Sequence, residues 1–174
     1  MSSASPFPTK RPQPDRMPSL DKLTLLAVGV VIMLVSLPRL HGLMLRTNEC
    51  DARDALRLLG GVVFAGERTP TNLCETVEQT ASLEHQLSDA RPVDGGRVLK
   101  HHGYLFELSS TLRGESVIYA WPSEHGRTGK RAFALKADQG MIEHENEGKS
   151  TWSGLARPLH ADETELSTGN WQPR

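Results

Sequence analysis

The sequence has 174 residues, a length that fits one domain with appendages but not two independent hydrophobic cores. Its formal net charge of −1 argues against the basic stripe that nucleic-acid-binding proteins carry, so we expect no nucleic-acid partner. The 2 cysteines do not form a CxxC pair, which excludes a four-cysteine zinc site.

The N-terminal region, residues 1–16, is rich in serine and proline and has neither helical nor strand periodicity. It carries Lys10, Arg11 and Arg16, so we predict a disordered, mildly basic cytoplasmic tail. Residues 23–37 then read LTLLAVGVVIMLVSL without a charge. As a helix this run covers roughly 22 Å, and flanking leucines extend it toward the roughly 30 Å of a bilayer core. We therefore predict a membrane-spanning helix.

Two other interpretations of this apolar run are a cleaved secretory signal and a buried core helix. No small-x-small cleavage site follows Leu37, and a core helix on a small domain should have a polar face, which this run lacks. Four basic residues precede the run, and only Arg39 and Arg46 follow it closely. The positive-inside rule therefore predicts a cytoplasmic N-terminus. We expect a single-pass protein of the inner membrane with a periplasmic or extracellular head.

The helical pattern continues beyond the membrane segment and becomes amphipathic, so we expect one helix over residues 17–66. Apolar residues recur on one side at helical spacing, namely Leu56, Leu59 and Val63. The charged residues of the same stretch are expected to face outward, namely Asp51, Arg53, Asp54 and Arg57. Pro38 removes a backbone hydrogen bond where the two parts meet, which predicts a kink. Gly60 and Gly61 are expected to weaken the end of the helix.

Residues 67–145 are predicted to form a head with a second helix and an antiparallel sheet. The helix begins at Thr69-Pro70 or at Asn72, where Glu75 suits a capping box, and it ends near Ser88. A loop is expected over residues 93–102. Alternating apolar residues then predict four strands, near residues 104–108, 117–121, 132–135 and 141–145.

The connections between these strands are short and contain glycine, so neighbouring strands form hairpins and the sheet is an antiparallel meander. The second half of the long helix is expected to cover its one apolar face. Residues 146–174 are polar and predict a mostly irregular C-terminal tail, with Trp152 docked on the sheet. Their acidic group Asp162, Glu163 and Glu165 matches no calcium loop.

Few residues in the sequence suggest chemistry. Cys50 and Cys74 could form a disulfide outside the cytoplasm or remain separate buried thiols, and the sequence leaves both possibilities open. His101 and His102 are adjacent, and two more histidines, His125 and His144, could approach them across the sheet. Their spacing is no metal signature, and neighbouring strand residues point to opposite faces, so we expect no metal site.

The segment GRTGK at residues 126–130 matches a phosphate loop only in part. Glu124 stands where the Walker pattern has glycine, and Arg131 replaces its serine or threonine. We predict a cationic hairpin loop whose Arg127, Lys130 and Arg131 contact acidic groups on a partner. No acid pair or nucleophile motif accompanies these residues, so we expect no enzyme activity, no cofactor and no small-molecule substrate.

A membrane helix that continues into an amphipathic one, followed by a loop and a small antiparallel meander, resembles the type IV pilins and the type II secretion pseudopilins. The segments HGYLFEL, SVIYAWP, GRTGKRAFAL and DQGMI are similar to the sheet of a pilin-like family. If Met17 is the first mature residue, Asp21 is the fifth, and Pro38 follows Met17 by 21 residues. The family typically has an acidic fifth residue and a proline at about that distance.

The resemblance implies an α+β fold and a structural function, namely assembly within a type II secretion or type IV pilus system. It implies that the partners are other pilin-like subunits or secretion-system proteins, together with membrane lipid. Asp21 would neutralise the N-terminal amine of a neighbouring subunit, because a carboxylate at a membrane entrance is costly unless it is paired. An alternative for Asp21 alone is a helix N-terminal acid that the macrodipole favours.

The possible processing site differs from the family pattern. The family's peptidase cuts after a glycine, whereas here Arg16 precedes Met17, and Pro18 follows it. An uncut chain would keep its tail and would lack the usual free amine near Asp21. The alternative function is therefore an uncleaved, single-pass membrane-anchored binding module of the cell envelope.

Overall fold

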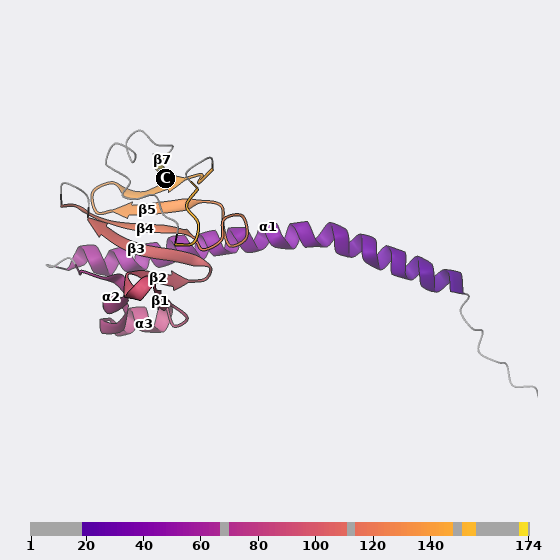
Figure 1. Ribbon diagram of the computed structural model, residues 1–174, viewed down its shortest axis with the longest axis horizontal. Coiled ribbons are helices and arrows are strands. Elements are labelled where there is room, and N and C mark those ends of the chain that lie inside the picture. Colours follow the sequence, from indigo (N-terminus) through magenta and orange to yellow (C-terminus); the bar gives the residue numbers. More distant parts are fainter. Residues whose placement is uncertain (1–18, 67–69, 111–113, 148–150, 156–170, 174) are drawn as a thin grey trace, which may run out of the picture. The chain divides into compact units, whose positions relative to one another are not determined.

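The computed structural model describes residues 19–66, 70–110, 114–147, 151–155 and 171–173 (Figure 1). The fold is α+β, as predicted, with a long N-terminal helix α1, Ser19–Ala65, and one seven-stranded sheet. The chain consists of two compact units, Met1–Arg39 and Leu40–Arg174. The predicted tail over residues 1–16 lies outside the described residues.

Within the first unit, α1 carries the predicted apolar segment. Among the described residues, α1 is the one helix long and apolar enough to cross a membrane, with a mean hydropathy of 2.2 over its most apolar window. None of that window is buried, and Leu26 is 68% exposed. This exposure contradicts the interpretation as a buried core helix. Pro38 lies inside α1, so the helix continues through the proline.

Within the second unit, one face of α1 belongs to the core of the head. The buried residues recur at helical spacing and are Leu45, Ala52, Ala55, Leu56, Leu59 and Val63. Gly60 is also buried, and a β-carbon there would clash with the Leu135 side chain. The helix continues past Gly60 and Gly61 to Ala65. The missing side chain at Gly60 lets α1 approach the sheet closely.

The predicted second helix consists of two short ones, α2, Leu73–Gln79, and α3, Ala81–Gln86. Asn72 caps α2 as predicted, because its side-chain oxygen accepts a hydrogen bond from the Cys74 N–H at 2.8 Å. Thr80 separates the helices because its backbone is extended, with φ −113° and ψ 98°. The apolar spacing matches a single helix because Leu73 and Val77 of α2 and Leu83 of α3 belong to the same core.

The sheet contains β1 to β7 in chain order, and each strand pairs antiparallel with the next. The strands are β1, Arg91–Val93; β2, Val98–His101; β3, Tyr104–Ser110; β4, Ser116–Pro122; β5, Ala132–Lys136; β6, Gly140–His144; and β7, Trp171–Pro173. The meander and its four predicted strands are confirmed. The predicted loop over residues 93–102 is wrong, because β2 occupies Val98–His101, and a 3₁₀ turn, Asp94–Gly96, joins it to β1.

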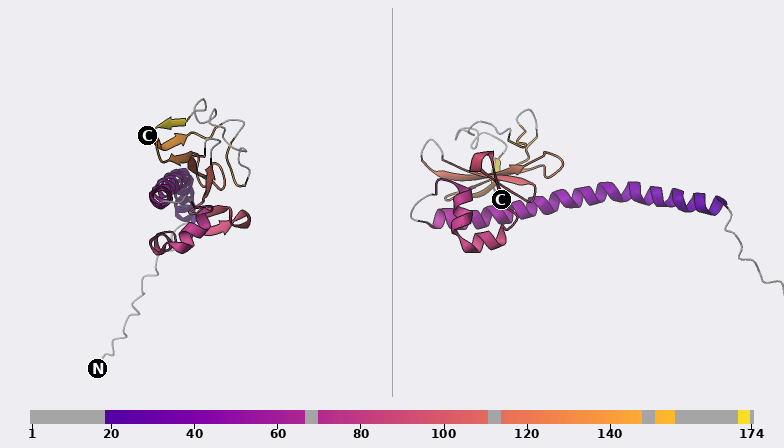
Figure 2. Two further views of the ribbon diagram at one scale, coloured as in Figure 1. Left: turned by 90° about the vertical axis from the view of Figure 1, so that its left-hand side faces the viewer. Right: turned by 60° about the horizontal axis from the view of Figure 1, so that its bottom comes forward.

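The sheet is buried on both faces, whereas one apolar face was predicted. The helices α1, α2 and α3 lie against the first face (Figure 2), and their buried residues form one core cluster with Phe106, Ile118 and Phe133. On the second face, Trp121 and Trp152 pack with Tyr119. Trp152 and Trp171 of the predicted C-terminal tail therefore belong to the core, whereas residues 148–150, 156–170 and 174 of that tail lie outside the described residues.

Trp152 docks on the sheet as predicted, and it is only 7% exposed. The Trp121 indole N–H donates to the Gly154 carbonyl at 2.8 Å, which holds the same segment. β7 adds Trp171 to this face by pairing with β6, and this strand was not predicted. Aromatic packing therefore places the described segments 151–155 and 171–173 on the head.

Asn146 is a buried connector on this second face and is 0% exposed. Its amide nitrogen donates to the Trp152 carbonyl at 2.9 Å and to His125 Nδ1 at 3.2 Å, and its oxygen accepts from the Trp152 N–H at 2.6 Å. Its backbone N–H donates to His144 Nδ1 at 2.8 Å. One side chain thus joins the end of β6 to two other segments.

Replacing Asn146 with alanine should lower the free energy of unfolding by about 2–4 kcal/mol, because several buried partners lose their hydrogen bonds. Urea unfolding of the full-length protein in detergent micelles, followed by tryptophan fluorescence, measures the change. The matched control is Glu145→Ala at an exposed neighbouring position, where we expect less than about 0.5 kcal/mol. Equal effects of the two substitutions would contradict the role of Asn146.

A second prediction concerns pH. Burial lowers the pKa of His144 below its ordinary value of 6.5, against the opposing effect of Glu145. At acidic pH the folded protein then binds fewer protons than the unfolded chain. The contribution of His144 to the free energy of unfolding is therefore complete above about pH 6.5 and is lost as the pH falls through the folded pKa. His144→Asn keeps a hydrogen-bond acceptor for the Asn146 N–H but does not titrate. Its unfolding temperature should fall less than that of the wild type between neutral pH and about pH 5; parallel profiles would refute this.

Candidate functional site

The residues predicted to serve assembly lie in the first unit. Asp21 is exposed in the first turn of α1, where a carboxylate is favourably placed at the positive end of the helix dipole. Pro38 is exposed within the same helix. The possible processing residues Arg16 and Met17 lie outside the described residues.

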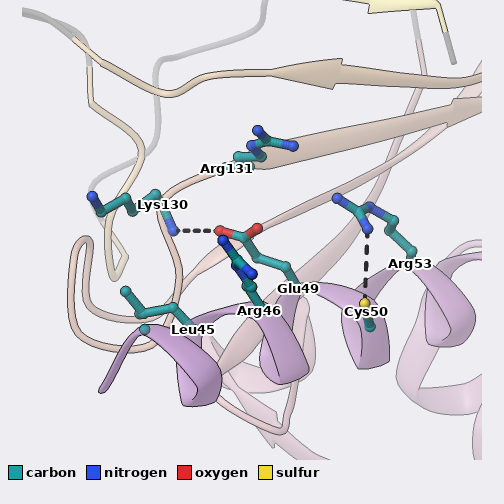
Figure 3. A pocket seen from close by; sticks show the side chains of 8 residues that line it. Leu45, Arg46, Glu49, Cys50, Arg53, Lys130 and Arg131 are labelled. Carbon is teal, nitrogen blue, oxygen red and sulfur yellow. Dashed lines mark hydrogen bonds between the residues drawn. The ribbon is translucent and has the colours of Figure 1, made fainter. Parts of the chain in front are cut away.

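A cleft of about 430 Å³ opens in the second unit between α1 and the segment that precedes β5 (Figure 3). We call it the cationic cleft, and its lining residues are Gly42, Leu45, Arg46, Glu49, Cys50, Arg53, Lys130 and Arg131. The α1 residues follow at spacings of three and four, so they share one helix face. Lys130 and Arg131 come from the predicted cationic loop, about 80 residues further along the chain.

Hydrogen bonds hold that loop against α1. The Asn48 amide donates to the Thr128 carbonyl at 2.8 Å, and His41 Nε2 lies 3.0 Å from the Gly126 carbonyl oxygen. The Glu49 carboxylate accepts from the backbone N–H of Lys130 at 3.1 Å. The contacts come from His41 and, about two turns later, from Asn48 and Glu49, so α1 holds the loop at two points along its length.

The Tyr104 ring supports the same loop from within the head. Its hydroxyl donates to the Arg131 carbonyl at 3.0 Å, and burial raises its pKa far above the usual range, so it remains a neutral donor. Gly129 passes so close to this ring that a β-carbon would clash with it. Gly129, which matched part of the phosphate-loop pattern, therefore lets the backbone of the loop lie directly against the Tyr104 ring.

The charges in the cleft are only partly compensated. Arg53 lies 3.5 Å from the Glu143 carboxylate and stacks over Phe133, and Arg131 also pairs with Glu143. Arg46 and Lys130 are exposed, and neither side chain forms an ion pair within the part of the chain that the structure describes. The cleft therefore offers two cations, backed by fixed guanidinium groups, to an anionic group such as a carboxylate or phosphate.

Two of the three residues of the predicted partner-binding loop line the cationic cleft. Lys130 and Arg131 line the cleft, whereas Arg127 lies outside its lining and pairs with Glu124 at 2.8 Å. Sequence reasoning missed Arg46 and placed Arg53 on an outward face. Arg46 lies three residues before Glu49 and Arg53 lies four residues after it, and this helical spacing could have identified both.

The cysteines fit neither possibility that the sequence left open. Both thiols are free, and only Cys74 is buried. Cys74 lies 3.8 Å from the Val98 carbonyl, and burial raises the pKa of its thiol, with Glu78 and Glu75 acting in the same direction. Cys50 is exposed in the cationic cleft, with its sulfur 3.9 Å from Arg53 Nη1.

The histidines are arranged differently from the prediction. The rings of His101 and His102 stack at 4.1 Å, so the expectation that they point to opposite faces is wrong. Strand alternation fails because His102 and Gly103, with φ of 42° and 79°, form the two-residue turn between β2 and β3. His125 and His144 instead lie with Asn146. Burial lowers the pKa of His101, against the opposing effect of Asp89.

Comparisons with known proteins add no assignment to this geometry. No family model, curated protein or solved structure matches the chain.

Glu49 connects the cationic loop to α1, so replacing it should lower the stability of the head. We expect Glu49→Ala to lower the free energy of unfolding by about 1–3 kcal/mol, because the carboxylate is only 9% exposed and accepts the Lys130 N–H among several cations. Denaturant unfolding in detergent micelles measures this. Glu78→Ala, on the exposed side of α2, is the control and should change stability by less than about 0.5 kcal/mol. Identical losses for the two variants would rule out the contact's role.

Proposed function

We propose that this chain is a membrane-anchored, pilin- or pseudopilin-like structural subunit that assembles through its N-terminal helix. The observation that carries the proposal is the double character of α1. Its early residues are apolar and exposed on all sides, whereas one face of its late residues belongs to the core of an antiparallel head. This combination suits a helix that meets lipid or neighbouring helices at one end and a folded domain at the other.

The exposed apolar segment needs a cover. Large side chains from residue 23 to residue 37 are about half or more exposed, including Leu23 at 68% and Val30 at 49%. Soluble monomers rarely expose a contiguous apolar surface larger than a few hundred Å². A bilayer or a bundle of identical helices provides such a cover, and a filament subunit uses both in turn.

Asp21 supplies specificity in this proposal. A carboxylate at the start of an apolar helix is costly in a bundle unless a cation meets it. The N-terminal amine of a neighbouring subunit would be such a cation if processing exposes Met17. The mechanism is then helix burial with one intermolecular charge pair, without bond chemistry, and the partners are other pilin-like subunits or secretion-system proteins.

A second candidate function is an uncleaved, single-pass membrane-anchored binding module of the cell envelope. The cationic cleft favours it, because Arg46 and Lys130 leave two exposed cations beside fixed guanidinium groups. Such a module would bind an acidic segment of another envelope protein through the cleft, while α1 holds it at the inner membrane. Its N-terminal tail would remain attached.

The cellular location and the N-terminal residue of the protein made in its native cells distinguish the two functions. We expect the protein to remain with membranes after carbonate extraction, and N-terminal sequencing of the extracted protein to begin at Met17. Residues upstream of Met17 would favour the anchored module. Recovery in the soluble fraction after gentle lysis would exclude both functions.

Assembly provides a separate test of Asp21. Asp21→Ala should abolish intermolecular cross-links between the α1 helices of neighbouring subunits, whereas Asp138→Ala, in an exposed turn of the head, should leave them unchanged. Cross-linking in intact membranes, read by gel electrophoresis, measures the outcome. Unchanged cross-linking of Asp21→Ala would remove this residue from the mechanism, leaving the membrane anchor itself intact.

A further inference from the structure

Three side chains with metal-binding atoms meet beside the β2–β3 turn. Asp89 follows α3, His101 ends β2 and His102 lies in the turn, and one ligand atom from each lies within 4.8 Å of the others. The cluster is separate from the cationic cleft and shares no lining residue with it. Two imidazole nitrogens and a carboxylate oxygen form a donor set typical of divalent transition metals.

His101 provides a buried nitrogen that no hydrogen bond satisfies. The residue is 6% exposed, and its Nδ1 lies 2.6 Å from Asp89 Oδ1. This approach lacks the alignment of a hydrogen bond, and Nδ1 has no hydrogen-bond partner in the described part of the chain. A buried polar atom left in this way is uncommon, and a cation shared by the nitrogen and the carboxylate would satisfy both.

His102 is oriented by carboxylates on both sides. Its Nε2 lies 3.1 Å from Asp89 Oδ2, and its Nδ1 lies 3.2 Å from Asp51 Oδ2 on α1. If Nδ1–H donates to Asp51, the Nε2 lone pair faces the second oxygen of Asp89. Metal-bound histidines commonly have such an outer carboxylate, which fixes the tautomer and the ring orientation.

We propose that Asp89, His101 and His102 bind one divalent transition-metal ion of the zinc class, with Asp51 as the outer partner of His102. The ligand atoms are His101 Nδ1, His102 Nε2 and a carboxylate oxygen of Asp89. Asp89 and His102 are 48% and 49% exposed, so the ion has an open position toward solvent for water or for a group from another molecule. Ligation connects the end of α3 to the β2–β3 turn and, through Asp51, to α1.

The alternative for the same contacts is a protonated His102 that bridges Asp51 and Asp89 without a metal. The two arrangements predict different effects of substitution at Asp51. Asn at this position still accepts the Nδ1–H, so metal binding should persist but weaken about 10- to 100-fold. An imidazolium bridge predicts no metal binding in any variant.

The test uses the full-length protein in detergent micelles, freed of metal with a chelator and titrated with zinc chloride by calorimetry at neutral pH. We expect one equivalent to bind and the unfolding temperature to rise with zinc concentration, since the ion binds only the folded arrangement. His102→Gln and Asp89→Asn should each remove both responses. His85→Gln, exposed on α3, is the matched histidine control and should bind zinc like the wild type.

Cobalt provides an independent readout, because its visible absorption reports nitrogen and oxygen coordination directly. A spectrum that appears with one equivalent of cobalt and is lost in His102→Gln would support the site. The proposal is overturned if the wild type and His102→Gln give the same heats and spectra, or if zinc leaves the unfolding temperature of the wild type unchanged.

Discussion

The structure of the head depends on the burial of one face of α1 against the sheet. Leu56 and Leu59 are completely buried there, and Gly60 lets the helix approach closely enough for this contact. Residues three, four and seven positions away share the same helix face, so the packing that fixes these leucines also orients Glu49 and Arg53. Hydrophobic burial thereby sets the position of the polar groups that form the cationic cleft.

Carboxylates on or near α1 organise the charged groups around this contact. Glu49 holds the β4–β5 connection, Glu143 fixes two guanidinium groups, and Asp51 orients His102. Each acid faces a segment far away in the sequence, so it joins elements as well as balancing charge. The proposed assembly, binding and metal functions all draw on this one helix, although they use different residues of it.

The second face of the sheet gives the head a second core. Three tryptophans and Tyr119 pack there, and the buried Asn146 side chain donates a hydrogen bond to the Trp152 carbonyl beside them. A sheet covered on both faces holds its strands in a fixed register, because a slip by one residue would exchange the two sets of buried side chains. The turns that reach α1 are therefore presented from a stable framework.

The sequence by itself determined the features that follow from local periodicity. The charge-free run predicts α1, alternating apolar residues predict β3 to β6, and Asn72 marks the start of α2. Only the tertiary structure decided the stacking of His101 on His102, the inward position of Arg53, the separate helices α2 and α3, and the strands β1, β2 and β7. These features arise from a positive φ at His102, from the extended backbone of Thr80 and from contacts between residues far apart in the chain, and none of these leaves a periodic pattern in the sequence.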